Sequence, residues 1–168
     1  MAQDISQWFA GKLPAGWFSG PPEVTSDGEE ILVVGMLPDV ELARGTSEDA
    51  RAAARTARID RYREETREER VKIAREAERQ FTRKVAWGAT CGDQTRIFTT
   101  LSVPVMTRLR LPERQILDTL VAGGVARSRS DALAWCVRLV GMHQADWIKG
   151  LRDAIVKVDE ARGKGPLN

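Results

Sequence analysis

The sequence predicts an α+β protein built from two modules, and three observations carry that prediction. An apolar run at residues 29–37 has the composition of a buried strand. The charged stretch that follows contains no glycine or proline between Gly45 and Gly88, which predicts one long helix. Residues 97–111 then alternate with a period of two, as extended chain with one buried face does. The N-terminal module is predicted as β-α-β-β, and the C-terminal module as strand-helix-helix with an extended last helix.

The composition is that of a globular protein without a large excess of charge. The 168 residues are 42% hydrophobic and 30% charged, which suits one medium domain or two small ones. The net charge is only +2, so any contact with nucleic acid must come from a local basic patch. The N-terminus lacks the pattern of a signal peptide, and no apolar stretch approaches the about 18 residues of a membrane span. We therefore expect a cytoplasmic protein that does not enter the membrane.

Residues 1–28 are rich in aromatic side chains and turn-forming residues. The pairs Trp8-Phe9 and Trp17-Phe18 each lie close to glycine and proline. Two interpretations are open: the rings cover the open face of a small sheet, or they form a platform on which nucleic-acid bases stack. Aromatic residues in such loops more often anchor the loop to a core, which favours the first.

The long helix is predicted from about Glu48 to Phe81, with Ser47 as its N-cap. Its least polar positions follow the helical period, and they are Ile59, Tyr62, Thr66, Arg70, Ile73, Ala77 and Phe81. Residues 51–84 hold twelve basic and seven acidic side chains, a net +5. Such a run is usually a solvated helix face. The functional alternative is a basic edge for phosphate contact, formed by Arg51, Arg55, Arg58 and Arg79.

A short strand is predicted at 84–88, and Cys91 falls in the turn that follows, at 89–95. Because proline cannot donate to a ladder, Pro104 is expected to split the alternating region into strands at 96–103 and 105–111. The predicted organisation is a module at 1–103, a second module at 104–162 and a flexible tail at 163–168.

The second module is predicted to contain two or three helices. The first runs from Pro112 to about Val121, and Gly123-Gly124 breaks it. An apolar helix then follows the basic turn at 127–130, with Gly141 as a potential interruption. Its continuation is amphipathic because apolar residues recur at helical spacing, at Trp147, Leu151, Ile155 and Val158.

Residues 105–140 resemble a ribbon-helix-helix domain of the Arc/MetJ/CopG type. The likeness lies in the alternating 108–111, in Leu111-Pro112-Glu113 at the start of the first helix, and in the basic turn that opens the second. The apolar spacing of the first helix also fits, at Ile116, Leu117 and Leu120. The resemblance covers about 36 of 168 residues, counted from the sequence.

That resemblance implies a homodimer that binds double-stranded DNA, as a transcriptional regulator or an antitoxin-like protein. In the family, the strands of two chains pair into an antiparallel ribbon that enters the major groove. Thr107, Leu109 and Leu111 would face the shared core, and Met106, Arg108 and Arg110 would take the base-reading positions. Arginine suits this role because its two parallel N–H groups match the guanine edge.

The start of the second helix supplies the second implied contact. Ser130 is expected to be the N-cap, and Asp131 lies in the first turn. In the family this turn clamps a DNA phosphate without reading sequence, which assigns phosphate contact to Arg127, Ser128, Arg129 and Ser130. Residues 104–140 hold six arginines and three carboxylates, a net +3, enough for a local patch.

Two alternatives remain open at this point. The strand at 105–111 follows another strand with only Pro104 between them, so it can either pair with a second chain or join the sheet of the first module. The second alternative is a non-enzymatic interaction or assembly protein, associated with RNA or ribosomes, that works through the long charged helix. The N-terminal module is assigned no single role: a protein partner, an effector and further nucleic acid all stay open.

Catalysis, metals and cofactors are not expected. His143 is the only histidine, and its neighbour Asp146 lies at ordinary helix spacing. The sequence contains no P-loop, GxGxxG or Ser-His-Asp set. The two cysteines, Cys91 and Cys136, are too few for a structural zinc site, and Cys136 is expected to be a small core residue.

Overall fold

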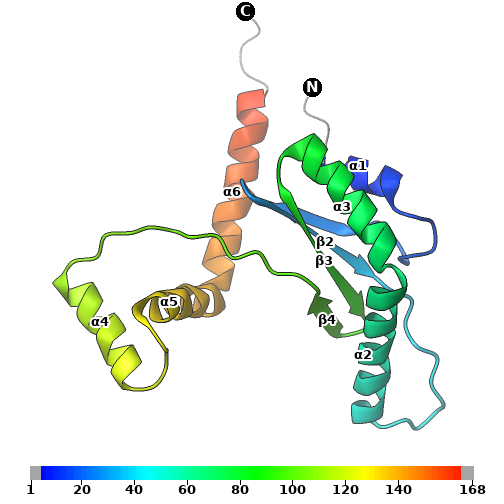
Figure 1. Ribbon diagram of the computed structural model, residues 1–168, viewed down its shortest axis with the longest axis horizontal. Coiled ribbons are helices and arrows are strands. Elements are labelled where there is room, and N and C mark those ends of the chain that lie inside the picture. The colour runs from blue at the N-terminus through cyan, green and yellow to red at the C-terminus, as the bar shows by residue number, and fades with distance from the viewer. Residues whose placement is uncertain (1–4, 164–168) are drawn as a thin grey trace, which may run out of the picture. The chain divides into compact units, whose positions relative to one another are not determined.

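The computed structural model describes residues 5–163, in which six helices and four strands follow one another along the chain (Figure 1). They divide into two compact units, Met1–Pro104 and Val105–Asn168. Of the tail predicted at 163–168, only Gly163 lies within the described residues. No helix in the described part of the chain is long and apolar enough to cross a membrane.

The first unit is built on a four-stranded sheet in the order β1-β2-β3-β4, with strands Glu23–Ser26, Glu30–Met36, Lys84–Cys91 and Gln94–Ile97. The outer pairs are antiparallel, whereas β2 and β3 are parallel, with Glu30 opposite Lys84 and Met36 opposite Thr90. A parallel pair needs a crossover connection, which α2 and α3 supply. The predicted α+β class is confirmed, and the structure adds α1 (Ile5–Lys12) and β1, which the sequence did not predict.

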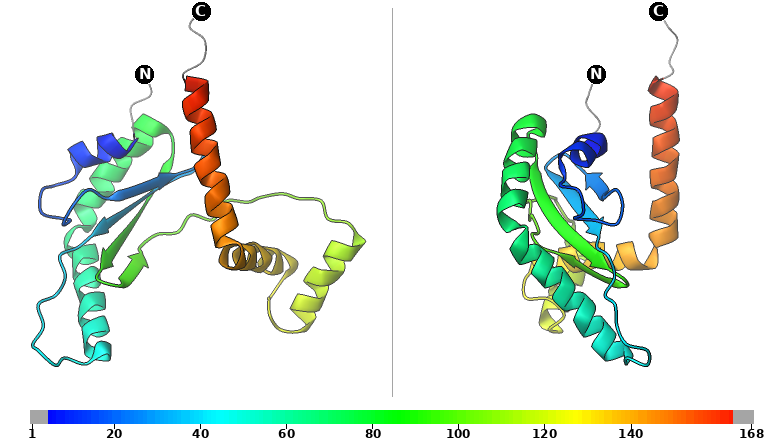
Figure 2. Two further views of the ribbon diagram at one scale, coloured as in Figure 1. Left: turned by 180° about the vertical axis from the view of Figure 1, so that it is seen from behind. Right: turned by 90° about the vertical axis from the view of Figure 1, so that its right-hand side faces the viewer.

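The core lies on one face of the sheet, beneath the helices. Trp8 and Phe9 of α1 share a buried cluster with Ile31 of β2, Ile73 of α3 and Trp87 of β3. Figure 2 shows α2 and α3 along one side of the sheet. The aromatic rings near the N-terminus therefore cover the sheet, and the interpretation as a base-stacking platform is wrong for Trp8 and Phe9, which are at most 8% exposed.

The long charged helix is in fact two helices, α2 (Glu48–Glu65) and α3 (Arg67–Phe81), which meet at Thr66. The hydroxyl of Thr66 donates to the carbonyl of Tyr62 at 2.6 Å. Arg70 Nη2 donates to the carbonyl of Arg63, also at 2.6 Å. These bonds satisfy carbonyl groups beside the break, which lets α2 and α3 lie on different parts of the sheet without a glycine or proline.

Two further predictions for these helices have clear outcomes. Ser47 is the N-cap of α2, as predicted, and its hydroxyl accepts from the backbone N–H of Ala50 at 3.3 Å. The apolar stripe is also confirmed, because Ile59 and Ile73 are buried. Arg70 also belongs to the buried stripe, since this arginine is only 7% exposed.

The strands after the crossover differ from the prediction in length. β3 continues to Cys91, which is fully buried at the end of the strand instead of lying in a turn. The predicted strand at 96–103 is wrong: β4 is Gln94–Ile97, and residues 98–110 belong to no strand. The buried face predicted from the alternation is also wrong, because Ile97, Leu101 and Val103 are 39–44% exposed. Phe98, at an even position, packs against the buried clusters instead. The N–H of Leu101 donates to the Glu30 carboxylate at 3.3 Å.

The second unit contains α4 (Leu111–Ala122), α5 (Arg129–His143) and α6 (Ala145–Gly163). The predicted first helix and the glycine break after it are confirmed; Gly123 caps α4, and Gly124 has a φ of 74° that glycine adopts readily. α5 ends at His143, two residues beyond the potential interruption at Gly141.

Candidate nucleic-acid interface

Residues 105–110, predicted as a reading strand, form an extended segment that pairs with no part of the described chain. The predicted strand at 105–111 is therefore absent from the single chain, and Leu111 is already the first residue of α4. The sheet of the first unit ends at β4, so the segment does not join it. A segment with no neighbouring strand cannot form a ladder, whatever its propensity. At its end the carbonyls of Leu109 and Arg110 accept hydrogen bonds from Arg114, whereas residues 105–108 form no ladder and can pair with a strand from another chain.

The side chains of this segment follow the directions that the resemblance implies only in part. Of the three residues predicted to face the core, Leu109 packs inward, whereas Thr107 and Leu111 are exposed within the single chain. Met106 is 97% exposed, and Arg108 and Arg110 are exposed as well. Leu109 lies between the two arginines in sequence and packs against the buried cluster of the second unit. The backbone at Arg110 is extended, with φ −80° and ψ 174°. The structure therefore places the three predicted base-contact residues on the exposed surface of one short segment.

The core of the second unit is small. Its buried members are Leu117, Ala126 and Ala132, two of which are alanines, and Leu109 and Cys136 are among the partly buried residues around them. Many large apolar side chains elsewhere in the unit are 46–69% exposed, which is far more than a finished core leaves uncovered. They include Leu111, Ile116, Val137, Met142, Trp147, Leu151 and Ile155. The predicted amphipathic face of α6 is thus present and uncovered within this unit.

The start of α5 is capped by Ser128, and the prediction of Ser130 as the N-cap is wrong. The Ser128 hydroxyl accepts from the N–H of Asp131 at 3.2 Å, and the Asp131 carboxylate accepts from the N–H of Arg127 at 3.0 Å. Ser130 is already inside the helix. Serines 128 and 130 both suit a cap by residue type, and the helix begins where the backbone first turns, one residue after Ser128.

The two arginines of this turn have different surroundings. The side chain of Arg127 is 96% exposed, with its Nε 3.8 Å from Asp131. Arg129 instead donates two hydrogen bonds to Asp118 of α4, at 2.6 and 2.7 Å. These bonds hold the pKa of the Asp118 carboxyl below its usual value. A phosphate at this turn would meet Arg127 and the exposed end of α5 directly, but would share Arg129 with Asp118.

Of the four arginines in the basic edge predicted on the long helix, Arg55 is engaged in ion pairs within the first unit, whereas Arg79 is exposed. Arg55 donates to both carboxylate oxygens of Asp39, at 2.9 and 2.6 Å, and to Asp93 at 2.8 Å. Its side chain is only 13% exposed. Gly92 leaves the room for it, because a Cβ there would lie 2.2 Å from Arg55 Nε. Arg55 thus ties together the chain segments after β2 and β3, which the sequence could not reveal.

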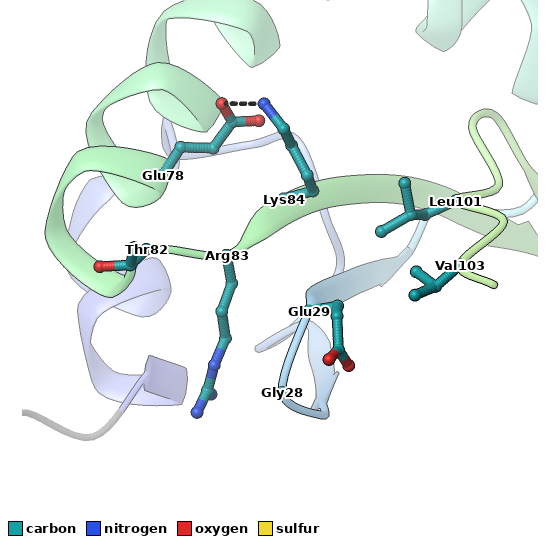
Figure 3. Close-up of a pocket in the computed structure, with 8 residues that line it drawn as sticks. All are labelled: Gly28, Glu29, Glu78, Thr82, Arg83, Lys84, Leu101 and Val103. Carbon is teal, nitrogen blue, oxygen red and sulfur yellow. Dashed lines mark hydrogen bonds and ion pairs between the residues drawn. The ribbon is translucent and has the colours of Figure 1, made fainter. Parts of the chain in front are cut away.

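A cavity of about 490 Å³ lies where residues 101–103 cross the sheet, and its charged lining is largely self-compensated (Figure 3). Lys84 and Glu78 form an ion pair of 3.1 Å across it. Arg83 bonds to Ser26 at 3.5 Å, and Glu29 carries the opposite charge nearby. The apolar side chains of Leu101 and Val103 close the remaining side, which attaches this segment to the first unit.

These features define the class of the protein: a two-unit α+β protein in which a sheet unit precedes a helical unit opened by an extended, arginine-bearing segment. The chain belongs to the family of Rv1265-like proteins. Residues 3–97 match the model of the N-terminal domain of that family, and residues 110–162 match the Mb1296 C-terminal domain. The residues between the two matches, 98–109, include most of the extended segment at 105–110.

Mycobacterial relatives resemble nearly the whole chain. Mb1296 of Mycobacterium bovis and Rv1265 of Mycobacterium tuberculosis are each 52% identical to it over 165 residues, 98% of this chain and 71% of the relative. No solved structure matches the chain. Neither matched family is described as ribbon-helix-helix, so that resemblance stays a prediction.

Proposed function

We propose that this protein is a cytoplasmic, non-enzymatic homodimer that binds specific sequences of double-stranded DNA, as a transcriptional regulator or antitoxin-like protein. The observation that carries the proposal is the segment 105–110: it is extended, unpaired, and places Met106, Arg108 and Arg110 in solvent directly before a helix pair. In the proposed dimer, two copies of this segment pair into a ribbon of the size that the major groove accepts.

Two features of the second unit support a dimer. An unpaired strand has free N–H and C=O groups, which a second copy of the same strand satisfies in antiparallel pairing. The uncovered apolar side chains of α4 and α5, such as Ile116 and Val137, would be buried by the helices of that copy. Buried apolar area contributes roughly 25 cal/mol per Å², so such faces strongly favour association.

The turn before α5 supports a separate contact with the DNA backbone. Ser128 caps the helix, and the exposed Arg127 lies beside its positive end. Such a contact fixes the orientation of the protein on the duplex and makes binding strongly dependent on salt. It carries no sequence information, so the base-reading role falls to the ribbon.

The proposal is tested by the mass of the protein in solution together with its binding to DNA. We expect light scattering to give twice the chain mass, and a mobility shift against genomic fragments to show a preferred fragment at both low and high salt. A strictly monomeric chain, or a shift that is equal for all fragments and vanishes at high salt, would contradict it.

The alternative function is an interaction or assembly protein, RNA- or ribosome-associated, that uses α2 and α3. Its support is the net +5 of residues 51–84, where Arg61 and Arg75 are exposed and form no ion pair with a described residue. Reversing these two charges should abolish binding under the alternative and leave duplex binding intact under the proposed function. Arg55 is unsuitable for this test because it holds the fold together.

A further inference from the structure

The break between α2 and α3 opens a second cavity in the first unit, of about 470 Å³. Its basic residues are Arg63 at the end of α2, and Arg67 and Arg70 in the first turn of α3. Trp87 of β3 and Phe98, just after β4, supply aromatic walls. Small-molecule sites in proteins commonly have volumes of about 300–1,000 Å³ and mostly apolar walls with a few polar groups.

The charge around this cavity is not balanced. Three guanidinium groups line it, against the single carboxylate of Glu64, which leaves a net +2. Arg63 and Arg70 lie over the ring of Phe98, with their guanidinium carbons 5.9 and 4.9 Å from the ring centre. None of the three arginines forms an ion pair with a described residue. The arrangement is thus an anion-attracting site with an aromatic platform.

Arg70 makes the imbalance unusual, because it is only 7% exposed. Its hydrogen-bond partners are neutral: the Thr66 hydroxyl at 3.0 Å and the Arg63 carbonyl at 2.6 Å. Burial is the main reason that the pKa of Arg70 is lowered. The positive charges of Arg63 and Arg67 act in the same direction, whereas Tyr62 and Glu64 act against it. A buried cation without a carboxylate partner is costly, and an anion that enters the cavity would offset that cost.

The aromatic wall also contains an unused donor. The indole Nε1–H of Trp87 is buried and has no hydrogen-bond partner among the described residues, although buried donors normally have one. Val71, Ala74 and Val85 complete an apolar lining beside it. The cavity therefore joins a positive group of arginines to an apolar, partly aromatic interior.

We propose that this cavity binds a small organic anion, whose phosphate or carboxylate group lies among Arg63, Arg67 and Arg70 and whose planar body lies beside Phe98 and Trp87. A small molecule fits better than a polymer, because Arg70 and Trp87 are almost fully buried and only a small group can reach them. The proposal concerns the first unit alone and does not rest on DNA binding by the second.

Titration calorimetry of the full chain with AMP, phenyl phosphate, benzoate and inorganic phosphate tests the proposal. At least one of the three ring-bearing anions should bind with a Kd of about 1 mM or tighter. Inorganic phosphate, which lacks a body to contact the aromatic wall, should bind about tenfold more weakly. Comparison of phenyl phosphate with benzoate then shows whether the site takes a phosphate or a carboxylate.

The decisive variant is Arg67→Ala, because Arg67 is exposed and makes no hydrogen bond that the fold needs. It should weaken binding about tenfold or more, as loss of a charged donor does. Arg61→Ala removes the same charge from α2 but does not line the cavity, so binding should be unchanged. The proposal is overturned if no ring-bearing anion binds, if inorganic phosphate binds as tightly as they do, or if the two variants behave alike.

Discussion

Arg129 and Asp118 join the first turn of α5 to α4 through two parallel hydrogen bonds, of 2.6 Å from Nε to Oδ1 and 2.7 Å from Nη2 to Oδ2. The pair fixes the angle between the two helices that follow the extended segment. It also places a carboxylate beside the turn proposed to contact a DNA phosphate. Asp118 therefore stabilises the packing of α4 on α5, and its negative charge repels the DNA phosphate proposed to bind at this turn.

Replacing Asp118 with asparagine should strengthen DNA binding. The change removes a negative charge and releases Arg129 toward the phosphate, so the slope of log affinity against log salt should steepen by up to about one. Fluorescence anisotropy at several salt concentrations measures this slope. Asp153→Asn makes the same charge change on α6, away from the turn, and should leave the slope as it is. Equal slopes for the two variants would show that Arg129 does not contact the DNA phosphate.

The Asp39–Arg55 pair should make the stability of the first unit depend on pH. Hydrogen bonds from Arg55 hold the pKa of Asp39 well below its usual value. A carboxyl whose folded pKa is depressed stabilises the fold above its unfolded pKa, about 3.9, and that contribution is lost as pH falls further. Asp39→Asn should therefore lower the melting temperature at pH 7. The difference from the wild type should shrink below about pH 4, and a difference that is constant from pH 7 to pH 2 would contradict this account.

Two glycines should respond to alanine in opposite ways. A Cβ at Gly35 would lie 2.1 Å from the Phe18 ring, so Gly35→Ala must displace that ring and should destabilise the first unit by about 1–3 kcal/mol. Gly11 is in α1 with nothing within 4 Å of an added Cβ, so Gly11→Ala should stabilise by about 0.5–1 kcal/mol. Urea unfolding of both variants measures the two free energies. An unchanged free energy of unfolding for Gly35→Ala would contradict the close packing of the Phe18 ring on β2.

Trp147 should matter for association more than for the fold of the single chain. Its side chain on α6 is 61% exposed, so it contributes little to the stability of the single chain. If α6 joins the proposed dimer interface, Trp147→Ala should raise the dimer dissociation constant about tenfold or more, as loss of a large aromatic residue does. Sedimentation equilibrium measures the constant, with Lys149→Ala as the control on the same helix. An unchanged constant would place α6 outside the interface.

The parts of the fold that the sequence predicted correctly depend on local signals. The apolar run of β2, the N-cap at Ser47 and the glycines after α4 each fix an element boundary from its own residues. α1 and β1 were missed because they are only eight and four residues long, too short for a clear period. Their positions depend on packing against the rest of the sheet.

The remaining differences come from contacts between distant residues. The break at Thr66 has no sequence signal, since its cause is a hydrogen bond from Arg70 to a carbonyl seven residues earlier. The ion pairs of Arg55 depend on Asp39 and Asp93, which come together only when β2 and β3 pair. In the candidate interface, the sequence predicted the exposed arginines at 108 and 110 but not the pairing of Arg129 with Asp118, because helix packing decides it.

The central claim is that Arg108 and Arg110 read DNA sequence from a ribbon shared by two chains. The most direct measurement is fluorescence anisotropy of the double variant Arg108→Ala/Arg110→Ala on the best duplex selected by the wild type and on a scrambled duplex. Arg138→Ala/Arg152→Ala, an equal loss of charge at exposed positions of α5 and α6, is the control. The account predicts that the first variant stays a folded dimer and loses its preference for the selected duplex, whereas the control keeps it. Retention of that preference by the first variant would contradict the account.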